Sequence, residues 1–254
     1  MVYILGVNIA ETNLQKACQK ISEWIDNKEK KYVCIAPAST IVDCQENESY
    51  KKAINSSGMT TPDGMPLVWI GKAKGVDIER TYGPDLLQAM NKLSEDKGYR
   101  NYFYGGTQES IELFVSKMKE MYPKLNIVGS VAPPIRKINE IESDETLSKI
   151  NEAKPDILWV GLGSPKQDFW MYNHREKLDA SVIIGVGAAF DFLAGIKKQA
   201  PVWMQRSGLE WFFRLCSEPK RLWRRYLIGN SKFIFYLLRD CLVGKKRGKV
   251  TNGV

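Results

Sequence analysis

The chain has 254 residues, of which 44% are hydrophobic and 26% charged, so it can bury a full core and is not a disordered polypeptide. Its five cysteines include no C-x-x-C pair, which argues against a disulfide framework and favours a reducing compartment. The net charge is +8, but residues 197–254 carry 14 Lys and Arg against three acidic residues, whereas residues 1–196 have a net charge of −3. Such asymmetry is typical of a chain that meets an extended anionic partner.

The start of the sequence indicates a cytoplasmic protein, and the pattern that follows predicts a helix and then a strand. Residues 1–13 have neither the basic segment nor the apolar run of a signal peptide, and no stretch reaches the ~18 apolar residues of a membrane-spanning helix. Residues 13–26 place apolar side chains on one helical stripe, and residues 32–36 read as a strand.

The middle of the chain alternates between apolar strands and helices. We expect strands at 101–106, 124–130, 156–163 and 181–187, a helix capped by Thr107, a polar helix around 139–153, and a helix that begins at Ser164-Pro165. This alternation predicts an α/β, Rossmann-like, mostly parallel sheet with helices on both faces. A composition shift near Gly195 divides an α/β core (1–196) from a basic, helical C-terminal appendage (197–254).

Three glycine-bearing turns follow predicted strands, at 104–107, 161–167 and 185–191. Ligands of open α/β sheets bind at the carboxyl ends of the strands, where glycine lets backbone N–H groups approach an anion. Each turn alone also fits tight packing, but the three together favour a nucleotide or sugar-nucleotide pocket. The G-x-G-x-x-G fingerprint is absent, which argues against an NAD-linked oxidoreductase.

Two carboxylates are candidates for chemistry. Asp63, in TTPDGMPLVW, is either a Pro-Asp-Gly turn residue or a base at the edge of a pocket. Asp191, between Phe190 and Phe192, is either a helix cap or an acceptor for a ligand hydroxyl. His174, the single histidine, lies in a polar helical stretch and is expected on the surface. With no histidine cluster and no D-x-D pair, we expect chemistry without a bound metal.

The last 58 residues interleave aromatic side chains with arginines and lysines. A basic amphipathic helix with aromatic residues on its other face suits the surface of an anionic bilayer. A core-packed helix with a solvated basic face is the alternative. Neither a zinc-finger pattern nor an RNA-recognition signature accompanies the charge, so nucleic acid is not an expected partner.

Six segments, in order between about residues 3 and 232, resemble the WecG/TagA/CpsF family of glycosyltransferases. They are TPDGMPLVW, ERTYGPDLL, FYGGT, VGLGSPKQDFW, GVGAAFDFLAG and APVWMQRSGLEWFFRLCSEPKRLWRRY. The resemblance implies a metal-independent, inverting enzyme without a cofactor, peripheral on the inner face of the cell membrane. Such enzymes move a sugar, typically from UDP-N-acetylmannosamine, to an undecaprenyl-diphosphate-linked sugar for surface polysaccharide or teichoic acid. Away from the bilayer, the appendage favours a homo-oligomer.

The resemblance also implies roles for individual residues. Asp63 matches the proposed general base and Arg80 a basic residue of the same cleft. Residues expected near the UDP-sugar are Gly105, Gly163, Ser164, Gln167, Gly187 and Asp191. Those expected to close over the diphosphates are Arg214, Arg221 and Arg224.

One departure from the family pattern concerns the donor sugar. Ala36 and Ala38 stand where the family usually has Thr and Asn. In the family, the polar side chains of this Thr and Asn would lie near the sugar. Because this chain lacks them, UDP-glucose or another UDP-hexose remains an alternative donor. A non-catalytic nucleotide-binding membrane adaptor is the alternative to an enzyme.

Overall fold

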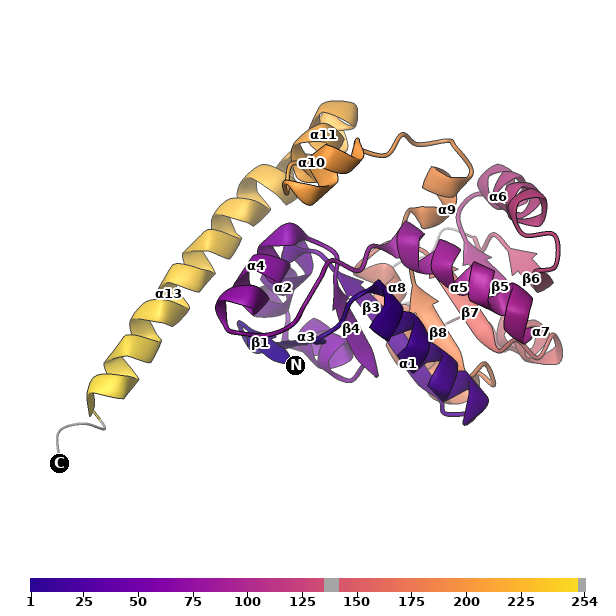
Figure 1. Ribbon diagram of the computed structural model, residues 1–254, viewed down its shortest axis with the longest axis horizontal. Helices are drawn as coiled ribbons and strands as arrows, with labels where there is room; N and C mark the ends of the chain where they lie inside the picture. The colour runs from indigo at the N-terminus through magenta and orange to yellow at the C-terminus, as the bar shows by residue number, and fades with distance from the viewer. Residues whose placement is uncertain (135–141, 251–254) are drawn as a thin grey trace.

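The computed structural model describes residues 1–134 and 142–250, with side chains described as far as residue 242. Its centre is a six-stranded parallel sheet in the order β4-β3-β8-β7-β5-β6 (Figure 1). The strands are β3 (Lys31–Ala36), β4 (Met59–Pro62), β5 (Arg100–Gly105), β6 (Asn126–Val131), β7 (Ile157–Gly161) and β8 (Val182–Gly185). The predicted α/β class and parallel sheet are therefore confirmed.

Helices cover both faces of the sheet because the strands are apolar on both sides. In β3, Val33 and Ile35 enter one core and Cys34 and Ala36 the other, as the two-residue period of a strand requires. One face carries α1 (Leu14–Asp26), α5 (Gly83–Lys97), α6 (Gln108–Met121) and α9 (Ala189–Leu193). The other carries α2 (Ala38–Glu46), α3 (Glu48–Asn55), α4 (Met65–Ala73), α7 (Asp144–Glu152) and α8 (Lys166–His174), which the short helix η1 (Arg175–Lys177) follows.

Most predicted boundaries agree with the structure. Asn13 caps α1, and Thr107 caps α6 through a reciprocal capping box with Ser110. Pro165 is the N-cap residue of α8 rather than its first helical residue. Of the helix expected around 139–153, residues 144–152 are helical, and 139–141 lie outside the described residues. Residues 1–13 contain a hairpin of β1 (Val2–Ile4) and β2 (Val7–Ile9).

The surface position expected for His174 is wrong. Its side chain is 1% exposed and packs against Trp170, with ring centroids 4.9 Å apart. Nε2 accepts a hydrogen bond of 3.1 Å from the backbone N–H of Glu142, so the proton lies on Nδ1, which donates to the Trp170 carbonyl at 2.7 Å. The ring is a buried structural link between α8 and the start of α7.

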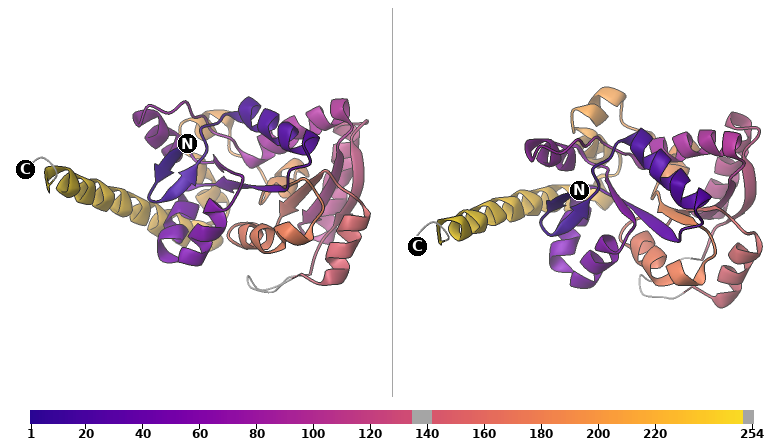
Figure 2. Two further views of the ribbon diagram at one scale, coloured as in Figure 1. Left: turned by 90° about the horizontal axis from the view of Figure 1, so that it is seen from below. Right: turned by 60° about the horizontal axis from the view of Figure 1, so that its bottom comes forward.

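The C-terminal segment, residues 197–250, follows α9 and consists of helices. These are α10 (Val202–Arg206), α11 (Glu210–Ser217), α12 (Pro219–Trp223), the π-helical η2 (Arg224–Ile228) and α13 (Gly229–Val250). Helix α13 passes α2 and then extends away from the rest of the molecule (Figures 1 and 2). Within the described part of the chain, no helix combines the length and apolarity needed to cross a bilayer.

Candidate functional site

A cleft of about 300 Å³ opens at the carboxyl ends of four neighbouring strands, β4, β3, β8 and β7. We call it the sheet-edge cleft. It lies where ligands of open parallel sheets bind. Its lining residues are Ile35, Pro37, Asp63, Tyr82, Gly83, Pro84, Leu162, Gly163, Ser164, Lys166, Gln167, Gly185, Val186, Gly187, Ala188, Phe192, Lys197, Arg214, Arg221 and Arg225.

The charges of the sheet-edge cleft are strongly biased toward an anionic ligand. Five cationic side chains line it, and Asp63 is its single carboxylate. The cations come both from the core, at Lys166, and from the segment beyond residue 196. Guanidinium groups bind phosphate oxygens through paired N–H donors, so this arrangement suits a diphosphate.

The side chain of Gln167 ties two of the glycine turns together. Its Oε1 accepts hydrogen bonds from the backbone N–H groups of Gly163, at 3.2 Å, and Gly187, at 2.8 Å. Its Nε2 lies 3.4 Å from the Ser164 hydroxyl. The two glycine amides that were expected to face an anion therefore donate to Gln167 in this structure. Both turns still line the cleft.

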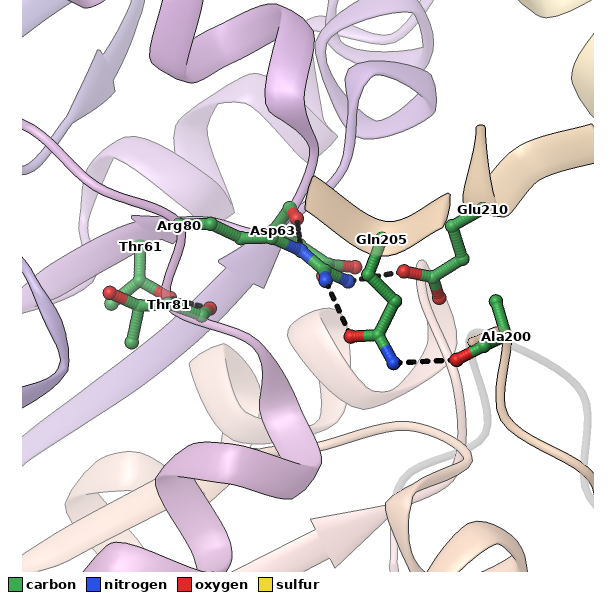
Figure 3. A network of polar contacts seen from close by, with 7 residues as sticks. All are labelled: Thr61, Asp63, Arg80, Thr81, Ala200, Gln205 and Glu210. Carbon is green, nitrogen blue, oxygen red and sulfur yellow. Dashed lines mark hydrogen bonds and ion pairs between the residues drawn. The ribbon is translucent and has the colours of Figure 1, made fainter. Parts of the chain in front are cut away.

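Asp63 follows β4 directly and shares a cation with the C-terminal segment (Figure 3). Its backbone N–H donates to the carbonyl of Ala36 at 3.0 Å, which fixes the turn against β3. Arg80 Nη2 lies 3.2 Å from Asp63 Oδ1 and also donates to Oε2 of Glu210 on α11. Among the described residues no hydrogen bond reaches Asp63 Oδ2, so this oxygen is open to a ligand.

Two further contacts hold the Arg80 guanidinium in place. Its Nη1 donates to Gln205 Oε1 at 2.9 Å, and Gln205 Nε2 donates to the Ala200 carbonyl at 2.8 Å (Figure 3). The guanidinium carbon lies 4.2 Å from the ring centroid of Tyr82. The carboxylate of the core and the helices α10 and α11 are thus joined through one arginine.

Burial and charge act in opposite directions within this cluster. Burial alone would lower the pKa of Arg80, but the carboxylates of Asp63 and Glu210 outweigh it and the pKa is raised. Burial raises the pKa of Glu210, and Asp63 adds to this, whereas Arg80 and Arg214 lower it. Arg80 is consequently a permanent cation between two carboxylates.

The other predicted site residues are not all brought to the sheet-edge cleft. Gly105, at the end of β5, lies one strand beyond it and packs against Gly161, whose backbone would be 2.6 Å from an added Cβ. Asp191 does not cap a helix; it binds Lys197 Nζ at 2.7 Å and so orients a cation that lines the cleft.

The three predicted arginines have different surroundings. Arg214 lines the cleft over the ring of Phe192, at 5.5 Å. Arg221 also lines it but pairs with Glu218, at 2.6 Å and 2.8 Å. Arg224 faces a different hollow, beside α2.

Neither of the two alanines at the family departure lines the cleft. Ala36, the last residue of β3, is fully buried, and Ala38 is the first residue of α2. Pro37, between them, does line it. In the described ranges, no three His, Cys, Asp or Glu side chains are grouped so as to hold a metal ion.

Comparison with known proteins identifies the family of the chain. The model of the glycosyl transferase WecG/TagA/CpsF family matches residues 2–247. The chain belongs to this family of glycosyltransferases. It is 30% identical over 240 residues to the N-acetylglucosaminyldiphosphoundecaprenol N-acetyl-β-D-mannosaminyltransferase of Bacillus subtilis, covering 90% of each chain. Enzymes of the same description from Bacillus spizizenii (28% over 217 residues, 85% of this chain and 82% of the relative) and Staphylococcus aureus (26% over 229, 88% and 87%) are also similar.

Several residues of the candidate site were not predicted from the sequence. Glu210 and Gln205 lie within the last family-like motif, but their contact with Arg80 spans 125 to 130 residues and has no local signal. Lys197 and Arg225 belong to a basic stretch that was assigned to a membrane surface as a whole. Tyr82, two residues after Arg80 in the ERTYGPDLL motif, could have been found from its closeness to Arg80 in the sequence.

Proposed function

We propose that this glycosyltransferase moves N-acetylmannosamine from UDP-N-acetylmannosamine to N-acetylglucosaminyl-diphosphoundecaprenol, with inversion and without a metal ion. The similar enzymes from three bacterial species carry this activity in their names. The observation that carries the proposal is the open oxygen Oδ2 of Asp63 in a cleft whose other charged side chains are cations.

In this proposal Asp63 is the general base. Its carboxylate takes the proton of the acceptor hydroxyl while that oxygen forms a bond to the anomeric carbon, and the bond from this carbon to the UDP oxygen breaks on the opposite face. The Pro-Asp-Gly turn is compatible with this role, because the backbone bond to Ala36 fixes the turn and leaves the side chain in the cleft. Arg80 holds the carboxylate through Oδ1.

The leaving diphosphate needs stabilisation as its negative charge grows. Arg214, Lys166 and Lys197 line the cleft and are the cations we assign to the donor, with Arg221 once Glu218 releases it. Arg224 is assigned to the acceptor side, since it faces the hollow beside α2.

The C-terminal segment is proposed to hold the enzyme on the inner face of the membrane, where a lipid-linked acceptor lies. Ile234, Phe235, Leu238 and Leu242 on α13 are 58%, 60%, 60% and 65% exposed, beside a large excess of Lys and Arg. Exposed apolar side chains together with basic ones match the interface of an anionic bilayer. In this scheme residues 1–196 form the catalytic core and 197–254 the membrane-associating appendage.

A second donor is favoured by one observation. Ala36 and Ala38 stand where the family pattern has a hydroxyl and an amide, on either side of Pro37, which lines the sheet-edge cleft. A UDP-hexose without an N-acetyl group, such as UDP-glucose, is therefore the competing donor.

The decisive experiment is UDP release from a panel of UDP-sugars, with and without a short-chain polyprenyl-diphospho-N-acetylglucosamine. We expect acceptor-dependent release from UDP-N-acetylmannosamine. Release from UDP-glucose alone would replace the donor, and tight UDP binding without release from any donor would favour a non-catalytic adaptor.

A further inference from the structure

A second hollow lies between α2 and the C-terminal helices, with a volume of about 410 Å³. We call it the α2–α13 groove, lined among others by Ser39, Thr40, Asp43, Ser164, Arg225 and Lys232. Its volume falls within the roughly 300–1,000 Å³ of small-molecule sites. Ser164 and Arg225 also line the sheet-edge cleft, so the two hollows adjoin.

The two walls of the α2–α13 groove differ in chemistry. The wall from α2 offers the hydroxyls of Ser39 and Thr40 and the carboxylates of Asp43 and Glu46. The opposite wall, from η2 and α13, offers Arg224, Arg225 and Lys232. Arg225 Nε donates to the Ser39 hydroxyl at 3.0 Å, and Lys232 pairs with Glu46, so the walls are in contact at two points. A free phosphate is a poor match for this groove, because the two carboxylates of the α2 wall would repel it. A sugar diphosphate fits better, since its hydroxyls can donate to the α2 wall and its phosphates can pair with the cations of the opposite wall.

Helix α13 presents its opposite faces to the groove and to solvent. Gly229 and Lys232 line the groove, and Tyr236, one turn on, donates to Glu46 at 3.2 Å. Ile234 and Leu238 lie four residues apart on the opposite face and are 58% and 60% exposed, and Leu227, which is 52% exposed, precedes them in η2. The groove side of α13 can therefore contact the polar head of a ligand, and the exposed apolar side of the same helix can contact a long apolar tail.

We propose that the α2–α13 groove binds the saccharide-diphosphate head of the lipid-linked acceptor, with the saccharide hydroxyls against α2, the diphosphate against Arg224 and Lys232, and the lipid along the exposed stripe of α13. This inference rests on the proposed function. It gives the acceptor a hollow of its own that meets the donor cleft at Ser164 and Arg225. Asp43 then contributes to the choice of acceptor sugar, since a carboxylate accepts hydrogen bonds from hydroxyls in a fixed position.

The test is the binding of farnesyl-diphospho-N-acetylglucosamine to the full chain saturated with UDP, measured by calorimetry. Asp43 is exposed, so its replacement leaves the core intact. Asp43→Asn is expected to weaken binding about tenfold, as for loss of one charged hydrogen bond, and Asp43→Trp, which fills the groove, to abolish it. The matched controls are Glu48→Gln and Glu48→Trp, at a carboxylate with 84% side-chain exposure outside the groove, which are expected to bind within twofold of the wild type.

Each outcome of this titration decides one point. Wild-type affinity in Asp43→Trp, or no binding to the wild type, overturns the groove as the acceptor site. Sugar transfer by the wild type, followed in the same samples, tests the proposed function separately. Binding without transfer of any sugar refutes the reaction and keeps the site, while transfer that Asp43→Trp leaves unchanged refutes the site and keeps the reaction.

Discussion

The α/β core and the C-terminal segment of this protein are stabilised in different ways. In the core, side chains cap α1, α3, α6 and α7, and apolar residues fill two clusters on the faces of the sheet. In the C-terminal segment no side chain caps α10, α11 or α12, and the large apolar residues are mostly exposed, Leu222 and Phe233 being buried exceptions. The core is held by its own packing. The segment is held by polar contacts with Arg80, Ser39 and Glu46 and by the apolar packing of Phe233, Tyr236 and Leu237 against one core cluster. The exposed apolar side chains of this segment are therefore available for contact with another surface.

The largest effect is expected in the core, at Asp63. Asp63→Asn keeps the shape of the side chain but removes its basicity, so the transfer rate should fall by about 10²–10⁴ while UDP affinity stays within twofold. Steady-state rates and UDP titration measure the two quantities. Asp96→Asn, on the exposed side of α5, is the control; a rate near that of the wild type in Asp63→Asn would exclude Asp63 as the base.

The next largest effect is expected on vesicle binding, which should depend on the exposed apolar side chains of α13 and not on those of the core. Phe235→Ser combined with Leu238→Ser removes two half-exposed side chains from α13, and burial of this area in a bilayer contributes about 2 kcal/mol, or about 30-fold in affinity. Sedimentation with phosphatidylglycerol vesicles measures the partition. Leu113→Ser with Met121→Ser, at exposed apolar sites of the core, should change nothing. Equal losses in the two pairs would mean that α13 is not the membrane surface.

Replacement of Glu210 tests the ion pair with Arg80 that joins the C-terminal segment to the core. Glu210→Gln leaves Arg80 paired with Asp63 alone, so the guanidinium competes more strongly with the acceptor hydroxyl for this carboxylate, and we expect kcat about tenfold lower with an unchanged donor KM. Because the pKa of Glu210 is raised, acidification neutralises it at a higher pH than an ordinary glutamate. The wild-type rate should therefore begin to fall at a higher pH than that of Glu210→Gln.

The control for this profile is Glu120→Gln, an exposed carboxylate on α6. It should reproduce the wild-type pH profile and rate. Superimposable acid limbs in the wild type and Glu210→Gln would separate Glu210 from the chemistry.

The smallest effect concerns stability in the core. Thr107→Ala removes the cap of α6 and should cost about 1 kcal/mol, lowering Tm by about 2–4 °C. Ser116→Ala, at an exposed position of the same helix, should lie within about 0.5 kcal/mol of the wild type. Differential scanning calorimetry compares them. A larger loss for Ser116→Ala than for Thr107→Ala would contradict the importance of the cap.

The layered fold was predictable because its signals are local. The stripe on α1, the Thr107 cap and the apolar strands at 156–163 and 181–187 each lie within a few residues of chain. The burial of His174 was not, since the polar stretch around it gives no sign that Trp170 and the backbone of Glu142 enclose the ring. Packing against distant segments overrides a local pattern.

The composition of the site was predictable in part for the same reason. Gly163 and Gly187 lie at the ends of strands that were predicted, and both line the cleft together with Asp63. Asp63 was identified from its Pro-Asp-Gly turn and its motif, because the short strand β4 before it was not predicted. Gly105 also follows a recognised strand but lies elsewhere, because strand order places β7 and β8 between β5 and β3 and cannot be read from the sequence. The bond between Arg80 and Glu210 joins two regions whose relative position only the folded chain defines.

The Gln167 side chain has a consequence for the thermodynamics of ligand binding. One carbonyl oxygen receives the amides of Gly163 and Gly187, so two turns from different strands are ordered before any ligand arrives. The conformational entropy of these turns is therefore lost during folding and is not lost again in each catalytic cycle. A ligand that binds between these two turns therefore meets a pocket wall that is already ordered, which lowers the entropic cost of its binding.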